Sequence, residues 1–150
     1  MKKARIEGYM FLNEKMLREA FWKCYNYKKR AIRCFTEVDL THGRVDLMTL
    51  EVYKDNYQIN SFEFKIADIK KGILKACANK QFSSKSWLVL PKEKQELINS
   101  KYQEDLKRNG IGVLLVADDG RWEAVLKPNY RKIVVLDQKT LNVLSEMVVR

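Results

Sequence analysis

Two carboxylates and one lysine on neighbouring segments of this chain have the types and spacing that metal-dependent chemistry needs. Glu63 and Lys65 lie two positions apart in a segment where apolar and polar residues alternate, so in a strand both project from one face while Phe64 projects from the other. Asp46 lies in the preceding apolar segment, and a hairpin of the two segments would bring its carboxylate to Glu63. Mg²⁺ prefers such hard oxygen ligands, and a lysine beside them stabilises charge that develops in a transition state. The pattern predicts metal-assisted hydrolysis of phosphodiester bonds.

The spacing of an acid two positions before a lysine occurs four times, at Glu63, Asp68, Asp105 and Asp137. The last three fall in predicted helices or at a helix start, where residues two apart do not share a face. Only Glu63 lies in an alternating segment with another acid on a strand upstream. The alternative interpretation is a solvated sheet face that carries an ordinary cross-strand pair of glutamate and lysine.

The elements that must position these residues follow from the apolar patterns and the turn signals. Residues 57–66 alternate strictly, as in a half-buried strand, whereas residues 111–117 form a nearly continuous apolar run, as in a strand buried on both faces. The predicted order is a helix capped by Asn13, strands from residue 31 and over 45–53 and 57–66, a helix over 68–82, a strand over 86–90, a helix that ends at Asn109 and Gly110, strands over 111–117 and 121–126, and a helix over 138–149. This order predicts a single α/β domain over residues 1–150, with a mixed sheet and helices on both faces.

The charge balance favours a polyanionic partner. The chain has 29 Lys and Arg against 19 Asp and Glu, a formal net charge of +10, which favours nucleic acid first and an anionic membrane surface second; a basic surface that serves solubility alone is the other interpretation. No run approaches the ~18 consecutive apolar residues of a membrane span. The three cysteines lack zinc-site spacing, and the single histidine suggests no nucleophile pair. We therefore expect a cytoplasmic protein.

Several further segments keep a fixed order around Asp46 and Glu63. They are residues 44–47, a turn at 54–56, residues 62–66, a helix begun by Asp68, and then residues 79–82, 86–91 and 111–116. In order and spacing they resemble the PD-(D/E)xK nuclease superfamily over roughly residues 37–125. The resemblance implies a restriction-endonuclease-like mixed β-sheet flanked by helices. The residue before Asp46 is Val45 rather than proline, a departure that is common in the superfamily.

The resemblance also implies roles for individual residues. Asp46 and Glu63 would bind Mg²⁺ or Mn²⁺ together with the main-chain carbonyl of Phe64, and Lys65 would orient the attacking water or stabilise the transition state. Members of the superfamily often add an acid from the first helix. That acid is Glu14 or Glu19 here, with Glu37 on the next strand as a third candidate. Among these three we include Glu19 with the predicted catalytic residues.

Many members place a glutamine in the helix after the Glu-x-Lys strand, and here Lys75 stands where it is expected, with Asn79 and Gln81 nearby. This departure leaves open an altered substrate contact or a degenerate site. The lysines of the same helix form a predicted phosphate-binding rim, to which residues 28–30 and Lys85 would add. The predicted rim of this helix consists of Lys70, Lys71, Lys75 and Lys80. Tyr25, Tyr27 and Trp87 are candidates for base stacking or for the core.

The expected function is therefore a metal-dependent nuclease that acts on DNA in preference to RNA. The first alternative is the same fold with a decayed site, which binds nucleic acid or a protein partner without cutting it. The second is an accessory subunit or inhibitor in a mobile-element or host-defence system. A homodimer or a larger protein partner is compatible with either alternative.

Overall fold

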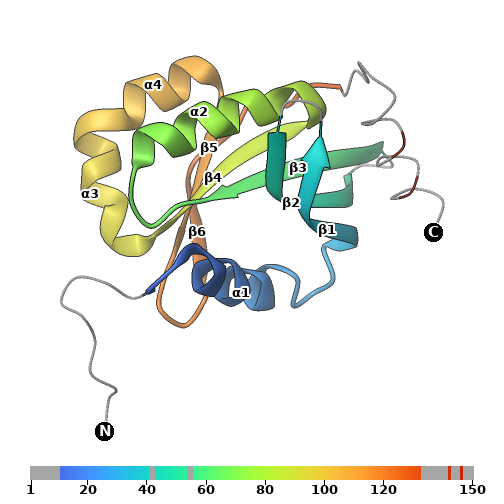
Figure 1. Cartoon of the computed structure of the whole chain (residues 1–150), viewed down its shortest axis with the longest axis horizontal. Helices are drawn as coiled ribbons and strands as arrows, with labels where there is room; N and C mark the ends of the chain where they lie inside the picture. The colour runs from blue at the N-terminus through green and yellow to red at the C-terminus, as the bar shows by residue number, and fades with distance from the viewer. Residues whose placement is uncertain (1–10, 41–42, 54–55, 133–141, 143–145, 147–150) are drawn as a thin grey trace, which may run out of the picture.

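Six strands form one mixed sheet in which each strand lies beside its neighbours in the sequence (Figure 1). The computed structural model describes residues 11–40, 43–53, 56–132, 142 and 146. The strands are β1 (Ala31–Leu40), β2 (Gly43–Tyr53), β3 (Asn56–Phe64), β4 (Lys85–Pro91), β5 (Gly112–Val116) and β6 (Trp122–Leu126). The first three are antiparallel, β3, β4 and β5 are parallel, and β6 returns antiparallel to β5. The predicted α/β class with a mixed sheet is confirmed.

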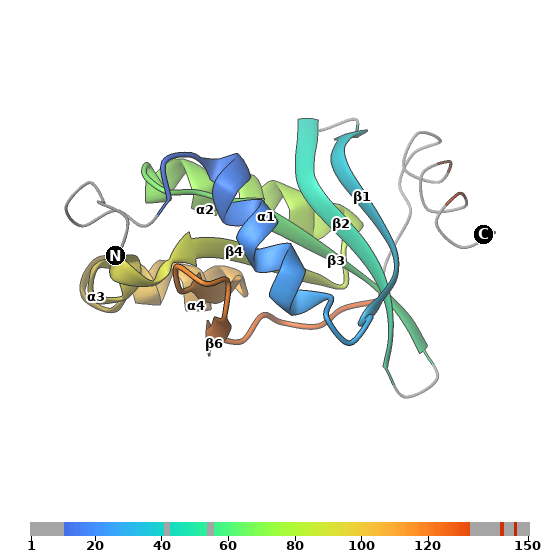
Figure 2. The same cartoon turned by 90° about the horizontal axis from the view of Figure 1, so that it is seen from below.

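Helices cover both faces of this sheet, with α1 (Glu14–Tyr25) on one face and α2 (Ile69–Asn79), α3 (Gln95–Leu97) and α4 (Gln103–Asn109) on the other (Figures 1 and 2). The reason lies in the strand order. The two parallel crossovers, from β3 to β4 and from β4 to β5, step in the same direction across the sheet. Right-handed crossovers of this kind put their helices on the same face, which leaves the opposite face to α1.

The two faces have separate cores because strand residues alternate between them. On the α1 face, the fully buried ring of Phe21 lies 5.5 Å from Phe62 and 5.6 Å from Phe64, measured between ring centroids. On the other face α2 packs closely on the sheet at Gly72, where an added Cβ would lie 2.8 Å from Leu88 Cδ1 and 2.8 Å from Lys65 Cγ. This close approach places α2 directly over the carboxyl end of β3.

The helix ends follow the local sequence signals. Asn13 caps α1, since its side-chain oxygen accepts a hydrogen bond from the backbone N–H of Met16 at 2.8 Å. Asp68 caps α2 by accepting from the N–H of Lys71 at 3.3 Å. Gly110 ends α4 with a φ of +68°, a left-handed conformation that costs little only for glycine. Each of these predicted ends is confirmed.

The predicted helix between β4 and residue 110 is present, but its helical type changes along its length instead of forming one regular α-helix. It consists of the 3₁₀ segment η2 (Lys92–Lys94), α3, the π-helical segment η3 (Ile98–Tyr102) and α4. A π turn inserts an extra residue, so the inward face shifts: Ile98 is fully buried, whereas the adjacent Leu97 is 37% exposed. A second 3₁₀ turn, η1 (Lys80–Phe82), follows α2.

Two further expectations concern a C-terminal helix and the absence of membrane-spanning segments. The predicted helix over 138–149 lies outside the described residues, apart from residues 142 and 146. Within the part of the chain that the structure describes, no helix is long and apolar enough to cross a membrane.

Candidate active site

Asp46 and Glu63 come together at one end of the β2–β3 hairpin. Leu47 is paired with Phe62, so the next positions along the two antiparallel strands are Asp46 and Glu63, both on the face covered by α2. The carboxylate of Asp46 accepts a hydrogen bond from the backbone N–H of Phe64 at 2.9 Å. This bond fixes the aspartate against the strand that carries the glutamate.

Glu63 is a buried carboxyl group, and its surroundings disfavour the ionised form. The residue is 1% exposed. Burial raises its pKa to about 8, and the negative charge of Asp46 acts in the same direction, whereas the positive charges of Lys75 and Lys65 oppose it. A hydrogen bond to Asp46 adds a smaller upward effect on this pKa. Among the described residues, Glu63 Oε1 is buried without a hydrogen-bond partner. Two carboxylates in contact, with one oxygen unsatisfied, make an arrangement that a divalent cation would stabilise.

Lys65 lies just beyond the end of β3, with its side chain 12% exposed. Its backbone N–H donates to the carbonyl of Val89 at 3.1 Å, and its aliphatic stem runs along α2 at Gly72. Its ammonium nitrogen, Nζ, is 3.8 Å from Glu14 Oε2 at the start of α1. The lysine is thus held between the end of the sheet and the first helix, with its cation near the carboxylate pair.

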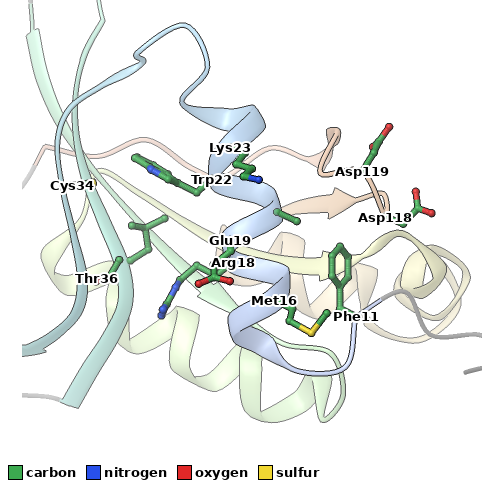
Figure 3. Close-up of a pocket in the computed structure, with 12 residues that line it drawn as sticks. Phe11, Met16, Arg18, Glu19, Trp22, Lys23, Cys34, Thr36, Asp118 and Asp119 are labelled. Atoms are coloured by element: carbon green, nitrogen blue, oxygen red, sulfur yellow. The ribbon is translucent and has the colours of Figure 1, made fainter. Parts of the chain in front are cut away.

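Of the three candidate acids, Glu14 is the one that the structure brings to Lys65. Glu19 instead lines a cavity of about 780 Å³ beside α1, where Figure 3 shows it next to Arg18 and across from Thr36. The structure therefore brings Glu14 to Lys65 and places Glu19, the acid included among the predicted catalytic residues, in the lining of this cavity. Residues four apart share a helix face and residues five apart diverge, so two acids at positions 14 and 19 of one helix cannot both face the same group.

Glu37 belongs to a surface network of charges rather than to the carboxylate pair. Its carboxylate oxygens lie 3.6 Å from Arg18 Nη1 and 3.4 Å from Arg44 Nη1. Its backbone has a φ of +51°, which is uncommon for a residue with a side chain.

The four predicted nucleic-acid-binding lysines have different surroundings. Lys75 Nζ is 3.8 Å from Glu63 Oε2, and the Lys75 side chain is 40% exposed. Lys80 Nζ donates to the carbonyl of Asn109, which ties η1 to the end of α4. Lys70 and Lys71 are exposed on the outer side of α2. Only the last two present their charges freely to a large partner, while Lys75 belongs to the candidate site itself.

Asp46 and Glu63 suit a divalent cation that is bound by only a few protein ligands. Within the described ranges, no group of three or more His, Cys, Asp or Glu side chains has the arrangement of a metal site. Asp46 and Glu63 therefore supply two carboxylates, to which the main-chain carbonyl of Phe64 is the predicted addition. Mg²⁺ commonly keeps several waters and binds through one or two carboxylates plus substrate phosphate, which is the arrangement these residues permit.

A second polar cluster, on the opposite face, was not anticipated from the sequence. Tyr25 Oη and Thr49 Oγ1 each donate to Glu51 Oε2 at 2.7 Å. Burial, with the charge of Glu51 next, raises the pKa of the Tyr25 phenol far above its usual range, so the phenol keeps its proton. The sequence does carry a pattern for this cluster. Thr49 and Glu51 flank an apolar residue on β2, and Gln58 and Asn60 flank one on β3. This alternation within each strand places the four polar residues on one face of the sheet.

Comparison with known proteins supports the fold alone. No protein-family model matches the chain, and no curated protein shows significant sequence similarity to it. A solved structure described as "SPO1766 protein of unknown function from Silicibacter pomeroyi" is similar in fold, with a TM-score of 0.60 at 16% sequence identity. The match covers 91% of this chain and 84% of that chain. The shared fold is the six-stranded mixed sheet with flanking helices.

Proposed function

We propose that this chain is a metal-dependent nuclease of the restriction-endonuclease-like fold, which hydrolyses DNA phosphodiester bonds with Mg²⁺ or Mn²⁺ at Asp46 and Glu63. The observation that carries the proposal is the pairing of the buried Glu63 with the partly buried Asp46, with Glu63 Oε1 left without a hydrogen-bond partner among the described residues and with Lys65 nearby. A buried carboxylate oxygen without a partner destabilises a fold, and a divalent cation bound at Glu63 would reduce that penalty.

The residues of the site have distinct roles in this proposal. The cation would supply Lewis-acid polarisation of the phosphoryl oxygens and lower the pKa of a bound water. Asp46 and Glu63 would hold it, with Asp46 fixed by its hydrogen bond to the Phe64 N–H. Lys65, fixed by the end of β3 and by packing against Gly72, would place a positive charge where negative charge develops on the phosphoryl oxygens. Glu14 would orient the Lys65 ammonium from the start of α1.

One observation favours a second candidate function, a nuclease-fold module that binds nucleic acid or a protein partner without cleavage. Lys75 reaches Glu63 to within 3.8 Å, and a lysine ammonium in that place partly compensates the carboxylate that a cation would otherwise neutralise. In this alternative the site is a structural ion-pair cluster, and the exposed Lys70 and Lys71 provide sequence-independent contacts to phosphates.

Metal titration together with a cleavage assay separates the two functions. We expect Mn²⁺ to bind to the wild type in calorimetry and Mg²⁺ or Mn²⁺ to support cleavage of plasmid or single-stranded DNA, both lost in Glu63→Gln. Glu123→Gln, at an exposed acid on β6, is the matched control and should behave as the wild type. Absence of both metal binding and cleavage in the wild type, with DNA binding retained, would reject the nuclease in favour of the binding module.

A further inference from the structure

A second cavity, of about 390 Å³, lies on the α1 face at the far end of the β2–β3 hairpin. Asp46 and Glu63 are near the start of β2 and the end of β3, whereas this cavity is lined from the end of β2 and the start of β3. Its volume lies within the range of small-molecule binding sites. The lining residues that matter for its chemistry are Tyr25, Glu51, Asn60, Lys85, Trp87 and Trp122.

The inner surface of the cavity presents hydrogen-bond acceptors. Glu51 is 8% exposed and uses one oxygen, Oε2, to accept from Tyr25 and Thr49. A carboxylate has about four lone-pair sites, so this glutamate retains capacity for further donors. Asn60, 2% exposed, hydrogen-bonds to the Tyr25 phenol through its side chain, yet its Oδ1 is buried with no partner among the described residues. A ligand that satisfies this end of the cavity must therefore bring N–H or O–H donors.

The walls of the cavity are aromatic. Trp122 lies 5.3 Å from Tyr25 between ring centroids, and Trp87 on β4 and Leu114 on β5 complete the apolar lining. Flat apolar surfaces of this kind favour a planar heterocycle. A cationic ligand is disfavoured because the Arg30 guanidinium already lies over the rings, at 5.4 Å from Tyr25 and 5.0 Å from Trp122.

The solvent side of the cavity is positively charged. Arg30 is exposed and Lys85 is partly exposed, and both line the cavity. The arrangement therefore combines buried acceptors, aromatic walls and cations toward solvent. An anionic group attached to a planar, donor-bearing ring meets all three requirements.

We propose that this cavity binds a guanine base carried on a phosphate, with the base edge toward Glu51 and Asn60 and the phosphate toward Arg30 and Lys85. Guanine presents two adjacent donors, N1–H and the N2 amino group, which suit two acceptors at this end of the cavity: the second oxygen of Glu51, since Oε2 already accepts from Tyr25 and Thr49, and Asn60 Oδ1. The Watson–Crick edges of adenine and cytosine offer only a single amino group. The same chemistry is offered by a free guanine nucleotide and by a guanine in a single-stranded nucleic acid. This cavity lies on the α1 face of the sheet, whereas the Asp46–Glu63 pair lies on the α2 face. Binding of a guanine ligand in the cavity therefore does not depend on cleavage at the pair.

The test is a tryptophan-fluorescence and calorimetric titration of the full chain with GMP, guanosine, AMP, CMP and UMP. Parallel titrations use tetranucleotides that contain one guanine or none. We expect saturable GMP binding that Glu51→Gln weakens by about tenfold, the effect of losing one charge-assisted hydrogen bond. Lys85→Ala should lower GMP affinity toward that of guanosine, with Arg30 keeping part of the difference, and should leave guanosine binding unchanged. Glu123→Gln serves as the matched acid control, and thermal denaturation checks that each variant is folded.

Each result decides the proposal. GMP binding with the expected loss in both variants identifies a free nucleotide as ligand, and the same losses seen only with the guanine tetranucleotide identify a single strand as its source. Equal affinity for all bases, no saturable binding to either kind of probe, or full GMP affinity in a folded Glu51→Gln would overturn it. Should Glu51→Gln fail to fold, the comparison of GMP with guanosine in Lys85→Ala still decides, because the Lys85 side chain is only partly buried.

Discussion

Replacing Glu63 by glutamine is expected to stabilise the metal-free chain, and increasingly so as the pH rises. The folded pKa of Glu63 is about 8, against an ordinary value of 4.5. A group with a raised folded pKa contributes stability that is fully present below the unfolded pKa and is lost as the pH rises through the folded pKa. For Glu63 that window runs from about 4.5 to about 8.

The magnitude follows from the separation of the two pKa values. At 1.36 kcal/mol for each pH unit, the separation corresponds to a loss of about 5 kcal/mol in the free energy of unfolding across the window. That is a large part of the roughly 5–15 kcal/mol that stabilises an ordinary domain. Glutamine keeps the shape of the side chain and does not ionise, so the variant avoids this loss and also relieves the repulsion from Asp46.

The assay is urea denaturation of the wild type and Glu63→Gln in EDTA at several pH values from 5 to 9. The difference between the two free energies should grow by about 1.4 kcal/mol for each pH unit until pH 8 and then level off. Titrating groups that do not interact with Glu63 are shared by the two proteins and cancel in this difference, whereas Asp46, Lys65 and Lys75 interact with Glu63 and are part of the measured effect. Saturating Mn²⁺ should restore stability to the wild type at high pH, since it binds the ionised form. Parallel stability curves for the two proteins over the whole range would refute the reasoning.

Three further changes have defined outcomes. Lys65→Ala should leave Mn²⁺ affinity equal or higher in calorimetry, because a competing cation is removed, while the cleavage rate falls on the order of 10²- to 10³-fold; loss of metal binding together with rate would contradict the assigned role. Phe64→Ala should lower the free energy of unfolding by about 3–5 kcal/mol in urea titrations, because the ring is 1% exposed and packs on Phe21; a loss below about 1 kcal/mol would contradict this packing. The dissociation constant for DNA should rise steeply between 50 and 200 mM salt through counterion release, with a shallower slope in the double variant of Lys70 and Lys71 to alanine, and a flat response would show that the basic surface does not bind phosphates.

The strand pattern was sufficient to predict which residues of the hairpin share a face. Alternation over residues 57–66 places Phe62 and Phe64 against α1 and Glu63 on the other side, and the structure has this arrangement. Such predictions succeed because a two-residue period is a local property of an extended chain. The caps at Asn13 and Gly110 were predictable for the same reason, since each depends on a few consecutive residues.

The contacts between elements could not be predicted in this way. The choice of Glu14 over Glu19 depends on how α1 lies across the end of β3, which is set by the packing of Phe21 and its neighbours rather than by spacing within the helix. The pairing of Lys75 with Glu63 depends on the close approach of α2 at Gly72. Both are tertiary effects, and a sequence pattern carries no direct signal for either.

The sequential order of the strands has a consequence for how the chain folds. Asp46 and Glu63 are separated by a single turn of the β2–β3 hairpin, so they meet when that hairpin forms, and α2, which follows in sequence, buries them afterwards. Loop closure over so few residues is fast compared with assembly of the parallel strands. We therefore expect electrostatic repulsion between the two carboxylates to oppose formation of this hairpin as well as to destabilise the native state. We expect the refolding rate of the metal-free chain to slow as the pH rises, so that a divalent cation would act on the speed of folding as well as on its end point.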